Sequence, residues 1–225
     1  MCNLYSNMTT QDEMRRLFEV DEEHDHLGNA EPQSAIYPRY NAPVVRLAAD
    51  GKRELLPMHR GFPMPQTSKK TGKPILPKAV NNARDDKLQS SRFWSASFRE
   101  RRCLVPASSF CEAKGRSPAT YFWFGLKGDV PRPPFAFAGL WRGFKGKYKD
   151  EDVDIITHTV VTSIPNELVK PVHPDRMVVI LDPTDYETWL HGTEDEAMAL
   201  CRPFDPERMQ IFKSGEDEKS DHGVL

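Results

Sequence analysis

The chain has 225 residues, enough to bury a sizeable core as one domain, and its 19 Pro and 13 Gly residues favour many short elements over long helices. No apolar run approaches the roughly 18 residues of a membrane-spanning helix, and the first twenty residues lack the pattern of a signal peptide. We therefore expect a soluble, intracellular protein, in the cytoplasm of a bacterium or the nucleus of a eukaryote.

The formal net charge of −2 hides a strong asymmetry along the chain. Residues 52–149 contain 21 Lys and Arg against 6 Asp and Glu, a net of +15, whereas the remainder contains 10 against 27, a net of −17. The basic middle predicts a surface for a polyanion. A solvated basic face is the alternative that composition leaves open.

The chain begins with Met1-Cys2. Removal of Met1 would give Cys2 two nucleophiles on adjacent carbons, an α-amine with an ordinary pKa of about 7.7–8.0 and a thiol with an ordinary pKa of about 8.5. The amine can condense with an aldehyde to a Schiff base, and the thiol can then close a five-membered ring. A frayed, inert terminus is the alternative.

The first half of the chain predicts a short helix, a hairpin and a second helix. Thr9 or Thr10 can cap the first helix, which ends near Val20. The acidic run 21–26 contains His24 and His26, which suit either a weak cation site or a solvated loop. Strands at 44–48 and 54–58 flank an Asp-Gly turn, residues 66–78 predict an exposed basic loop, and residues 93–101 predict a helix.

The second half predicts mainly strands. An apolar run covers 103–107 and 110–112, with Glu112 as its only charge. Further strands are expected at 120–124, 135–141, 154–161 and 178–181, with a turn at 143–149, one helical turn at 165–169, and short helices at 183–190 and 194–201. Because no βαβ alternation appears, the fold class predicted is α+β, with a mostly antiparallel, barrel-like β core and several short helices.

Three side chains offer what aldehyde capture by Cys2 needs. Burial on an apolar strand would raise the pKa of Glu112 and allow it to move protons at neutral pH. His173, close to Asp175 and Arg176, suits a donor to a developing oxyanion, and Asn82 suits a group that orients the amine. The structural alternatives are a buried Glu–Arg pair, a structural histidine and a helix cap. Cysteines 2, 103, 111 and 201 show no CxxC pair or zinc spacing, so we expect free thiols and neither a metal nor another cofactor.

Six short motifs occur in a specific order. They are Met1-Cys2, Arg39-Tyr40-Asn41-Ala42-Pro43, Asn82-Ala83-Arg84, the run from Cys103 to Ala107 that leads to Phe110-Cys111-Glu112, Thr162, and Val172-His173-Pro174-Asp175-Arg176-Met177. Their order, from residue 2 to about residue 213, resembles the signature of the SOS response-associated peptidase (SRAP) domain.

The resemblance implies a sensor of abasic sites in single-stranded DNA. In that family role Cys2 is the nucleophile that bonds to the sugar aldehyde as a thiazolidine, Asn82 orients it, Glu112 is the acid and base, and His173 assists ring opening and reversal. Self-removal of Met1 is also implied, alongside trimming by an ordinary aminopeptidase. The residues implied along the DNA path are Arg39, Asn41, Arg84 and Thr162.

The resemblance further implies one domain over residues 1–213, which we expect to be a monomer, followed by a disordered polar tail at residues 214–225. Three places depart from the family pattern: Asn3-Leu4 replaces Gly-Arg, His59-Arg60-Gly61 stands where a Trp-Gly pair is usual, and Ala113 replaces Trp. We therefore expect affinity for DNA to depend on the basic middle more than on base stacking.

Two other readings use fewer of these features. A cysteine peptidase acting on proteins would need the Cys2 thiolate and His173 as base. A non-catalytic binder of single-stranded DNA would need only the basic middle.

Overall fold

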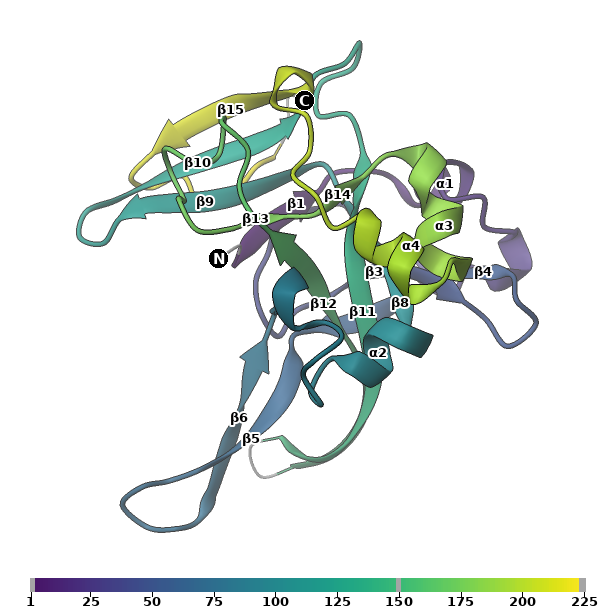
Figure 1. Ribbon diagram of the computed structural model, residues 1–225, viewed down its shortest axis with the longest axis vertical. Helices are drawn as coiled ribbons and strands as arrows, with labels where there is room; N and C mark the ends of the chain where they lie inside the picture. Colours follow the sequence, from purple (N-terminus) through teal and green to yellow (C-terminus); the bar gives the residue numbers. More distant parts are fainter. Residues whose placement is uncertain (1–2, 149–150, 223–225) are drawn as a thin grey trace.

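A closed barrel of five strands forms the centre of the molecule (Figure 1) in the computed structural model, which describes residues 3–148 and 151–222. Around the barrel each strand pairs with the next, and β11 pairs back to β12. Only the β12–β4 contact within this ring is parallel. The mostly antiparallel, barrel-like α+β fold is thus confirmed. The barrel strands are β12 (Glu151–Ser163), β4 (Arg53–Arg60), β3 (Asn41–Leu47), β8 (Arg102–Ala107) and β11 (Phe135–Tyr148).

Three short strands extend the barrel sheet. β7 (Asn82–Arg84) runs parallel to β12, β13 (Met177–Val178) pairs with β12, and β14 (Ile180–Leu181) pairs with β11. The sequence predicted one continuous strand at 178–181, but the chain crosses here from one barrel strand to another. Val179 makes that crossing, because its N–H donates to Val161 O and its carbonyl accepts from Ala138 N, both at 2.9 Å.

A second sheet packs against the barrel, with the order β15 (Met209–Gly215), β10 (Ala119–Leu126), β9 (Ser109–Gly115), β1 (Leu4–Asn7) and β2 (Gln33–Ile36). Its inner face contributes Tyr5 and Phe110 to a core shared with Phe137 of the barrel. The apolar run that ends at Glu112 therefore forms two strands, β8 in the barrel and β9 in the second sheet. The chain leaves the barrel at Ser108, whose N–H donates to Ser6 O at 2.9 Å.

Short helices cover the side of the barrel away from β9, β10 and β15 (Figure 1). Thr10 and Glu13 form a capping box at the start of the first helix, as the sequence predicted. The helical turn predicted at 165–169 is present as a single turn that does not continue into a helix: Lys170 N donates to Asn166 O at 2.9 Å, and Asn166 Oδ1 accepts from Val169 N at 3.0 Å. The α-helices are α1 (Gln11–Leu17), α2 (Ser95–Glu100), α3 (Tyr186–His191) and α4 (Glu194–Ala199), and the 3₁₀ turns are η1 (Glu22–His24), η2 (Asp85–Lys87), η3 (Pro183–Asp185) and η4 (Pro206–Arg208).

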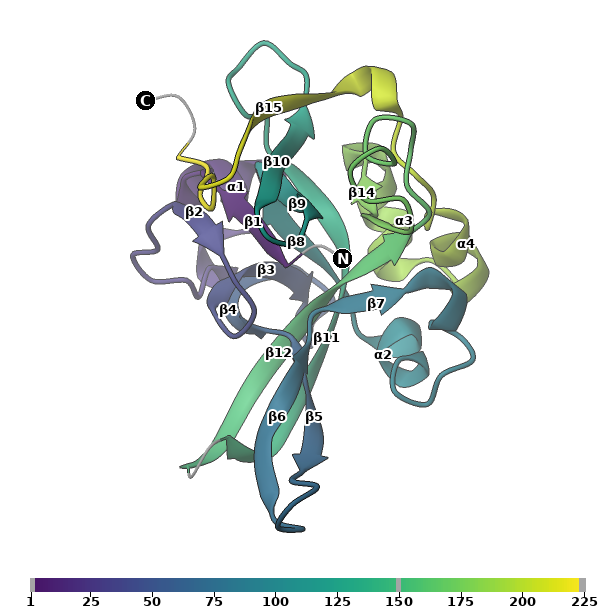
Figure 2. The same ribbon diagram turned by 90° about the vertical axis from the view of Figure 1, so that its left-hand side faces the viewer.

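Two predicted connections are strands. Of residues 66–78, expected as a loop, only 68–73 form one. The flanking residues belong to a two-stranded ribbon of β5 (Phe62–Thr67) and β6 (Pro74–Val80), which leaves the body beside the outer halves of β11 and β12 (Figure 2). The ribbon carries four prolines, which such exposed strands tolerate and which hide the alternation of a strand. The turn expected at 143–149 is also wrong, since β11 continues to Tyr148 and pairs there with Glu151 of β12.

The C-terminal segment contacts the second sheet. β15 pairs with β10, and Trp123 Nε1 donates to Glu218 O at 2.9 Å. Asp221 is buried, and its carboxylate accepts from Ser109 Oγ at 2.6 Å and from Arg132 at 2.7 and 3.0 Å. The expectation of a disordered tail from residue 214 did not anticipate these contacts; the single domain over residues 1–213 stays a prediction. None of the helices within the described residues is long and apolar enough to cross a membrane.

The Asp221–Arg132 pair generates a prediction about stability. Both side chains are largely removed from solvent, so Asp221→Ala would leave the Arg132 guanidinium without its carboxylate. We expect the variant to lose about 3–5 kcal/mol of unfolding free energy, measured by chemical denaturation. Glu216→Ala, at an exposed position of the same segment, is the control and should change little. Equal stability of the two variants would contradict a structural role for Asp221.

Candidate active site

Asn3, the residue after Cys2, is the point where three elements meet. Cys2 itself lies outside the described residues. The antiparallel register Leu4↔Cys111, continued by one residue, sets Asn3 opposite Glu112 of β9. Asn81 Nδ2, between β6 and β7, donates to Asn3 Oδ1 at 3.0 Å, and Arg60 Nη1, at the end of β4, donates to Asn3 O at 3.2 Å. The start of β1 is therefore held from its side chain and from its backbone.

Glu112 is a buried carboxyl group at this meeting point, with 3% of its surface exposed. Burial raises the pKa of Glu112 to about 7, although the positive charge of Arg60 opposes the rise. At neutral pH the acid and the carboxylate are therefore present in comparable amounts. A group of this kind can both give and accept a proton in one reaction cycle.

Arg60 is a fully buried arginine that the sequence flagged only as a departure from the family pattern. Its Nη1 donates to Ile36 O as well as to Asn3 O, and its guanidinium lies 4.5 Å from the centre of the Tyr5 ring. Gly61, with φ of +99°, then turns the chain into β5, where a Cβ would lie only 2.8 Å from Ala79 Cβ.

Asn82 and His173 come to the same region on different elements. Asn82 is buried on β7, opposite Val160 of β12 and directly after the Asn81 that bonds Asn3. Residues 81 and 82 are thus both placed by the pairing of β7 with β12. Nothing in the sequence distinguished Asn81 from an ordinary turn asparagine, and it was missed.

His173 lies in the connection between β12 and β13. Its Nδ1 accepts from the Arg176 N–H at 3.2 Å, which leaves the proton of a neutral ring on Nε2. Burial lowers the pKa of His173, while Asp175 opposes that change, so the ring is neutral at pH 7. Arg176 fastens this connection to the end of β7 through Asp85 at 2.5 Å and Asp86 at 3.1 Å.

Three of the four residues predicted along a DNA path are exposed. Arg39 has φ of +75°, and its Nη2 donates to Pro77 O of β6 at 3.1 Å. Asn41 is exposed at the start of β3, and Arg84 is exposed but forms two hydrogen bonds with Asp86 at 3.0 and 3.1 Å. Thr162 is fully buried and its Oγ1 donates to Ala83 O at 3.4 Å. The buried hydroxyl thus contacts β7 from β12, and a role for Thr162 on the DNA path stays a prediction.

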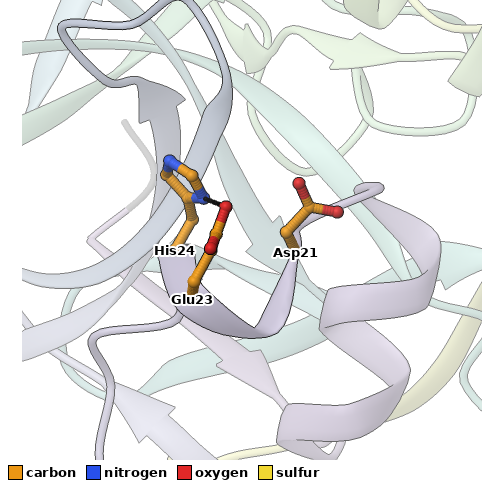
Figure 3. Close-up of side chains that lie close together, drawn as sticks. All are labelled: Asp21, Glu23 and His24. Atoms are coloured by element: carbon orange, nitrogen blue, oxygen red, sulfur yellow. Dashed lines mark ion pairs between the residues drawn. The ribbon is translucent and has the colours of Figure 1, made fainter.

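The acidic cluster of Asp21, Glu23 and His24 lies on the surface (Figure 3). The Lys52 ammonium is 3.0 Å from Asp21 and 3.2 Å from Glu23, and His24 Nε2 is 3.0 Å from Asp50 Oδ2. The cluster therefore already has a cation from the chain. It fits the solvated loop better than a metal site.

The described thiols are poor candidates for a nucleophile. Cys103, Cys111 and Cys201 are free. Burial raises the pKa of Cys201 to about 12 and raises that of Cys103 further above its ordinary value. Such thiols stay protonated at neutral pH and react slowly. Among the cysteines, Cys2 is left as the candidate that the sequence proposed.

Comparisons with known proteins find a matching family and several matching relatives. The family described as SOS response associated peptidase (SRAP) matches residues 1–216. "Abasic site processing protein YoqW" of Bacillus subtilis is 28% identical over 222 residues, which covers 95% of this chain and 92% of that protein. "Abasic site processing protein YobE" of the same organism is 28% identical over 225 residues, covering 95% and 94%.

Solved structures share the fold. A protein from Bordetella bronchiseptica matches with a TM-score of 0.70 at 24% identity, covering 94% of this chain and 100% of that one. A protein from Bacteroides thetaiotaomicron matches with a TM-score of 0.71 at 18% identity, covering 94% and 92%.

The buried Glu112 carboxyl generates a prediction about stability and pH. Its folded-state pKa of about 7 lies above the ordinary 4.5, so the stability that it contributes is complete below pH 4.5 and is lost as the pH rises through 7. Because glutamine does not titrate, the unfolding free energy of Glu112→Gln should not fall over this pH range. We expect the variant to gain on the order of 3 kcal/mol relative to wild type between pH 4.5 and 8, measured by denaturation at each pH.

Glu216→Gln is the control for this measurement, because it makes the same substitution at an exposed position. Its stability should follow that of the wild type throughout. A constant difference between Glu112→Gln and wild type across the pH range would show that Glu112 is charged at neutral pH.

Proposed function

Because this chain belongs to the SOS response-associated peptidase family, we propose that it processes abasic sites in single-stranded DNA, by bonding covalently to the sugar aldehyde through Cys2. The names of its relatives, abasic site processing proteins, support the class of substrate. The observation that carries the proposal is the buried carboxyl of Glu112, with a pKa of about 7, opposite the residue that follows Cys2.

The proposed reaction requires that Met1 has been removed, by the chain itself or by an aminopeptidase. The α-amine of Cys2 attacks the aldehyde carbon, the hydroxyl of the adduct leaves as water with a proton from Glu112, and the nitrogen returns a proton to the Glu112 carboxylate as the imine forms. The thiol then adds to the carbon of the resulting imine, and its proton passes to the imine nitrogen. Aldehyde and cysteine thus give a thiazolidine and one water, with no oxidant or reductant.

The surrounding residues take roles that their geometry allows. Asn82 orients the amine, and neutral His173 donates from Nε2 to the sugar ring oxygen as the ring opens. Arg60 and Asn81 do not react. They restrain Asn3, and so reduce the freedom of the nucleophile that precedes it.

A substitution that separates the two nucleophiles tests the chemistry. Cys2→Ser keeps the α-amine, so a Schiff base with abasic DNA should still form, but a hydroxyl closes the ring far less well than a thiol. We expect an adduct that survives a denaturing gel mainly after reduction with borohydride. Wild type should give a stable adduct without reductant.

The control for the amine retains an uncleaved residue before Cys2, which turns the amine into an amide and should abolish both adducts. A heat-stable adduct from this blocked protein would contradict the proposal. If the blocked protein instead cleaved peptides through its thiol, the chain would be the cysteine peptidase of the alternative reading.

Glu112→Gln tests the proton transfer. The amide keeps the shape of the side chain but does not titrate, so crosslinking to an abasic oligonucleotide should slow by roughly 10²–10⁴-fold. The wild-type rate should show the titration of Glu112 near pH 7, whereas the rate of the variant should follow only the ionisation of Cys2. Non-covalent binding, measured with an unreactive abasic analogue, should barely change. A wild-type rate in the variant would reduce Glu112 to a structural residue.

A further inference from the structure

A groove lies between the β5–β6 ribbon and the outer part of β11. Figure 2 shows that this ribbon lies at the opposite end of the molecule from β9 and β10. Its volume is about 670 Å³. We call it the ribbon groove. The ribbon lines the groove with Pro65, Lys73 and Ile75, and β11 lines it with Phe144, Lys145 and Lys147.

The lining of the ribbon groove is apolar and accessible. Ile75 has 48% of its surface exposed, which is unusual for a large hydrophobic side chain in this protein. Phe144 faces Gly146 on its own strand, where an added Cβ would lie 3.1 Å from Phe144 Cζ. The ring thus packs closely against this glycine and is partly exposed. An open aromatic ring next to aliphatic side chains suits the faces of nucleic-acid bases.

The rim of the ribbon groove is basic. The chain contains no Asp or Glu between Glu54 and Asp85, and the ribbon carries Lys69, Lys70, Lys73 and Lys78, all exposed. The described residues that line the groove include three lysines and no carboxylate. Lys145 pairs with Asp154 of β12 at 2.8 Å and Lys147 lies opposite Asp152 of β12, whereas Lys73 is exposed on the ribbon. The charge complements a phosphate backbone.

The ribbon groove continues toward the candidate active site along one strand. β6 starts in the groove and runs into Asn81 and Asn82, six residues after Ile75. At about 3.3 Å per residue this is about 20 Å, or about six nucleotides at the stacked spacing of 3.4 Å. Arg39, a residue predicted along the DNA path, bonds Pro77 O inside the groove. A single strand that leaves the site along β6 would therefore pass Arg39 and enter the groove.

We propose that the ribbon groove binds the single-stranded DNA that flanks the abasic site on one side, with bases against Ile75 and Phe144 and phosphates near Lys73 and Lys147. This rests on the proposed function. It differs from a general basic surface because the groove lies to one side of the candidate active site. It also assigns binding to residues far from the crosslinking chemistry.

The experiment uses the full chain and three oligonucleotides that carry an unreactive abasic analogue. One is about five nucleotides long. The second extends it by about ten nucleotides on the 5′ side only, and the third by about ten on the 3′ side only. Because about six nucleotides span the distance to the groove, each extension is long enough to enter it. Affinity is measured by fluorescence anisotropy across a range of salt concentrations. The variants are Ile75→Asp and the double substitution Lys73→Glu with Lys147→Glu.

Wild type should bind one of the extended oligonucleotides at least about tenfold more tightly than the short one. Both variants should remove that gain and leave the short oligonucleotide unaffected, and the lysine variant should lower the salt slope by about 1.4, for two phosphates. Lys127→Glu with Lys170→Glu is the matched control, at exposed lysines outside the groove, and should keep the preference.

Three results would overturn the proposal: variants that bind every oligonucleotide as wild type does, variants that weaken all three equally, or a wild type that gains equally from both extensions. Unaltered DNA affinity in the variants would assign the groove to another class of partner, such as a protein. Crosslinking of reactive abasic DNA by wild type is scored in parallel. Its absence would refute the proposed function, while the anisotropy measurements would still decide on the groove.

Discussion

The buried guanidinium of Arg60 is the interaction on which the candidate site depends. An arginine does not give up its charge, so its burial costs several kcal/mol unless acceptors surround it. The carbonyls of Asn3 and Ile36 and the face of Tyr5 supply that environment. Asn3 directly precedes β1, Tyr5 lies within β1, and Ile36 ends β2. One charge therefore fixes the barrel strand β4 to the N-terminal part of the second sheet. The position of the residue after Cys2 follows from the need to satisfy this charge.

The same charge sets the protonation of its neighbours. Burial raises the pKa of Glu112 to about 7, and Arg60 is one of the positive charges that oppose the rise. His158 is also buried beside Arg60. Burial lowers the pKa of His158 to about 3, and the positive charge of Arg60 lowers it further. His158 is therefore neutral at physiological pH and does not exchange protons there. Of these two buried groups, Glu112 alone titrates near neutrality.

Features that depend on local chemistry were predictable from the sequence. The capping box of α1 and the hairpin of β3 and β4 were found, and Glu112 stood out because a single carboxyl in an apolar run has to be buried. Long-range features were not. Arg60 and Asn3 are 57 residues apart, and no local pattern announces their contact. The break at Ser108 lacks a Gly or Pro signal, the prolines of β5 and β6 suggested a loop, and a threonine such as Thr162 gives no sign of whether its hydroxyl is exposed.

The departures from the family pattern are connected by this geometry. Arg60 stands where an aromatic residue is usual, and its side chain points into the interior to hold Asn3, so it offers nothing to a DNA base. Asn3, in place of glycine, has a side chain that accepts the Asn81 hydrogen bond and adds a second restraint. Ala113, exposed after Glu112, adds little stacking surface. The chain thus restrains the residue after Cys2 and has little aromatic surface beside it. Exposed apolar side chains occur instead on the ribbon, where Ile75 lies among lysines and β6 leads directly to Asn82.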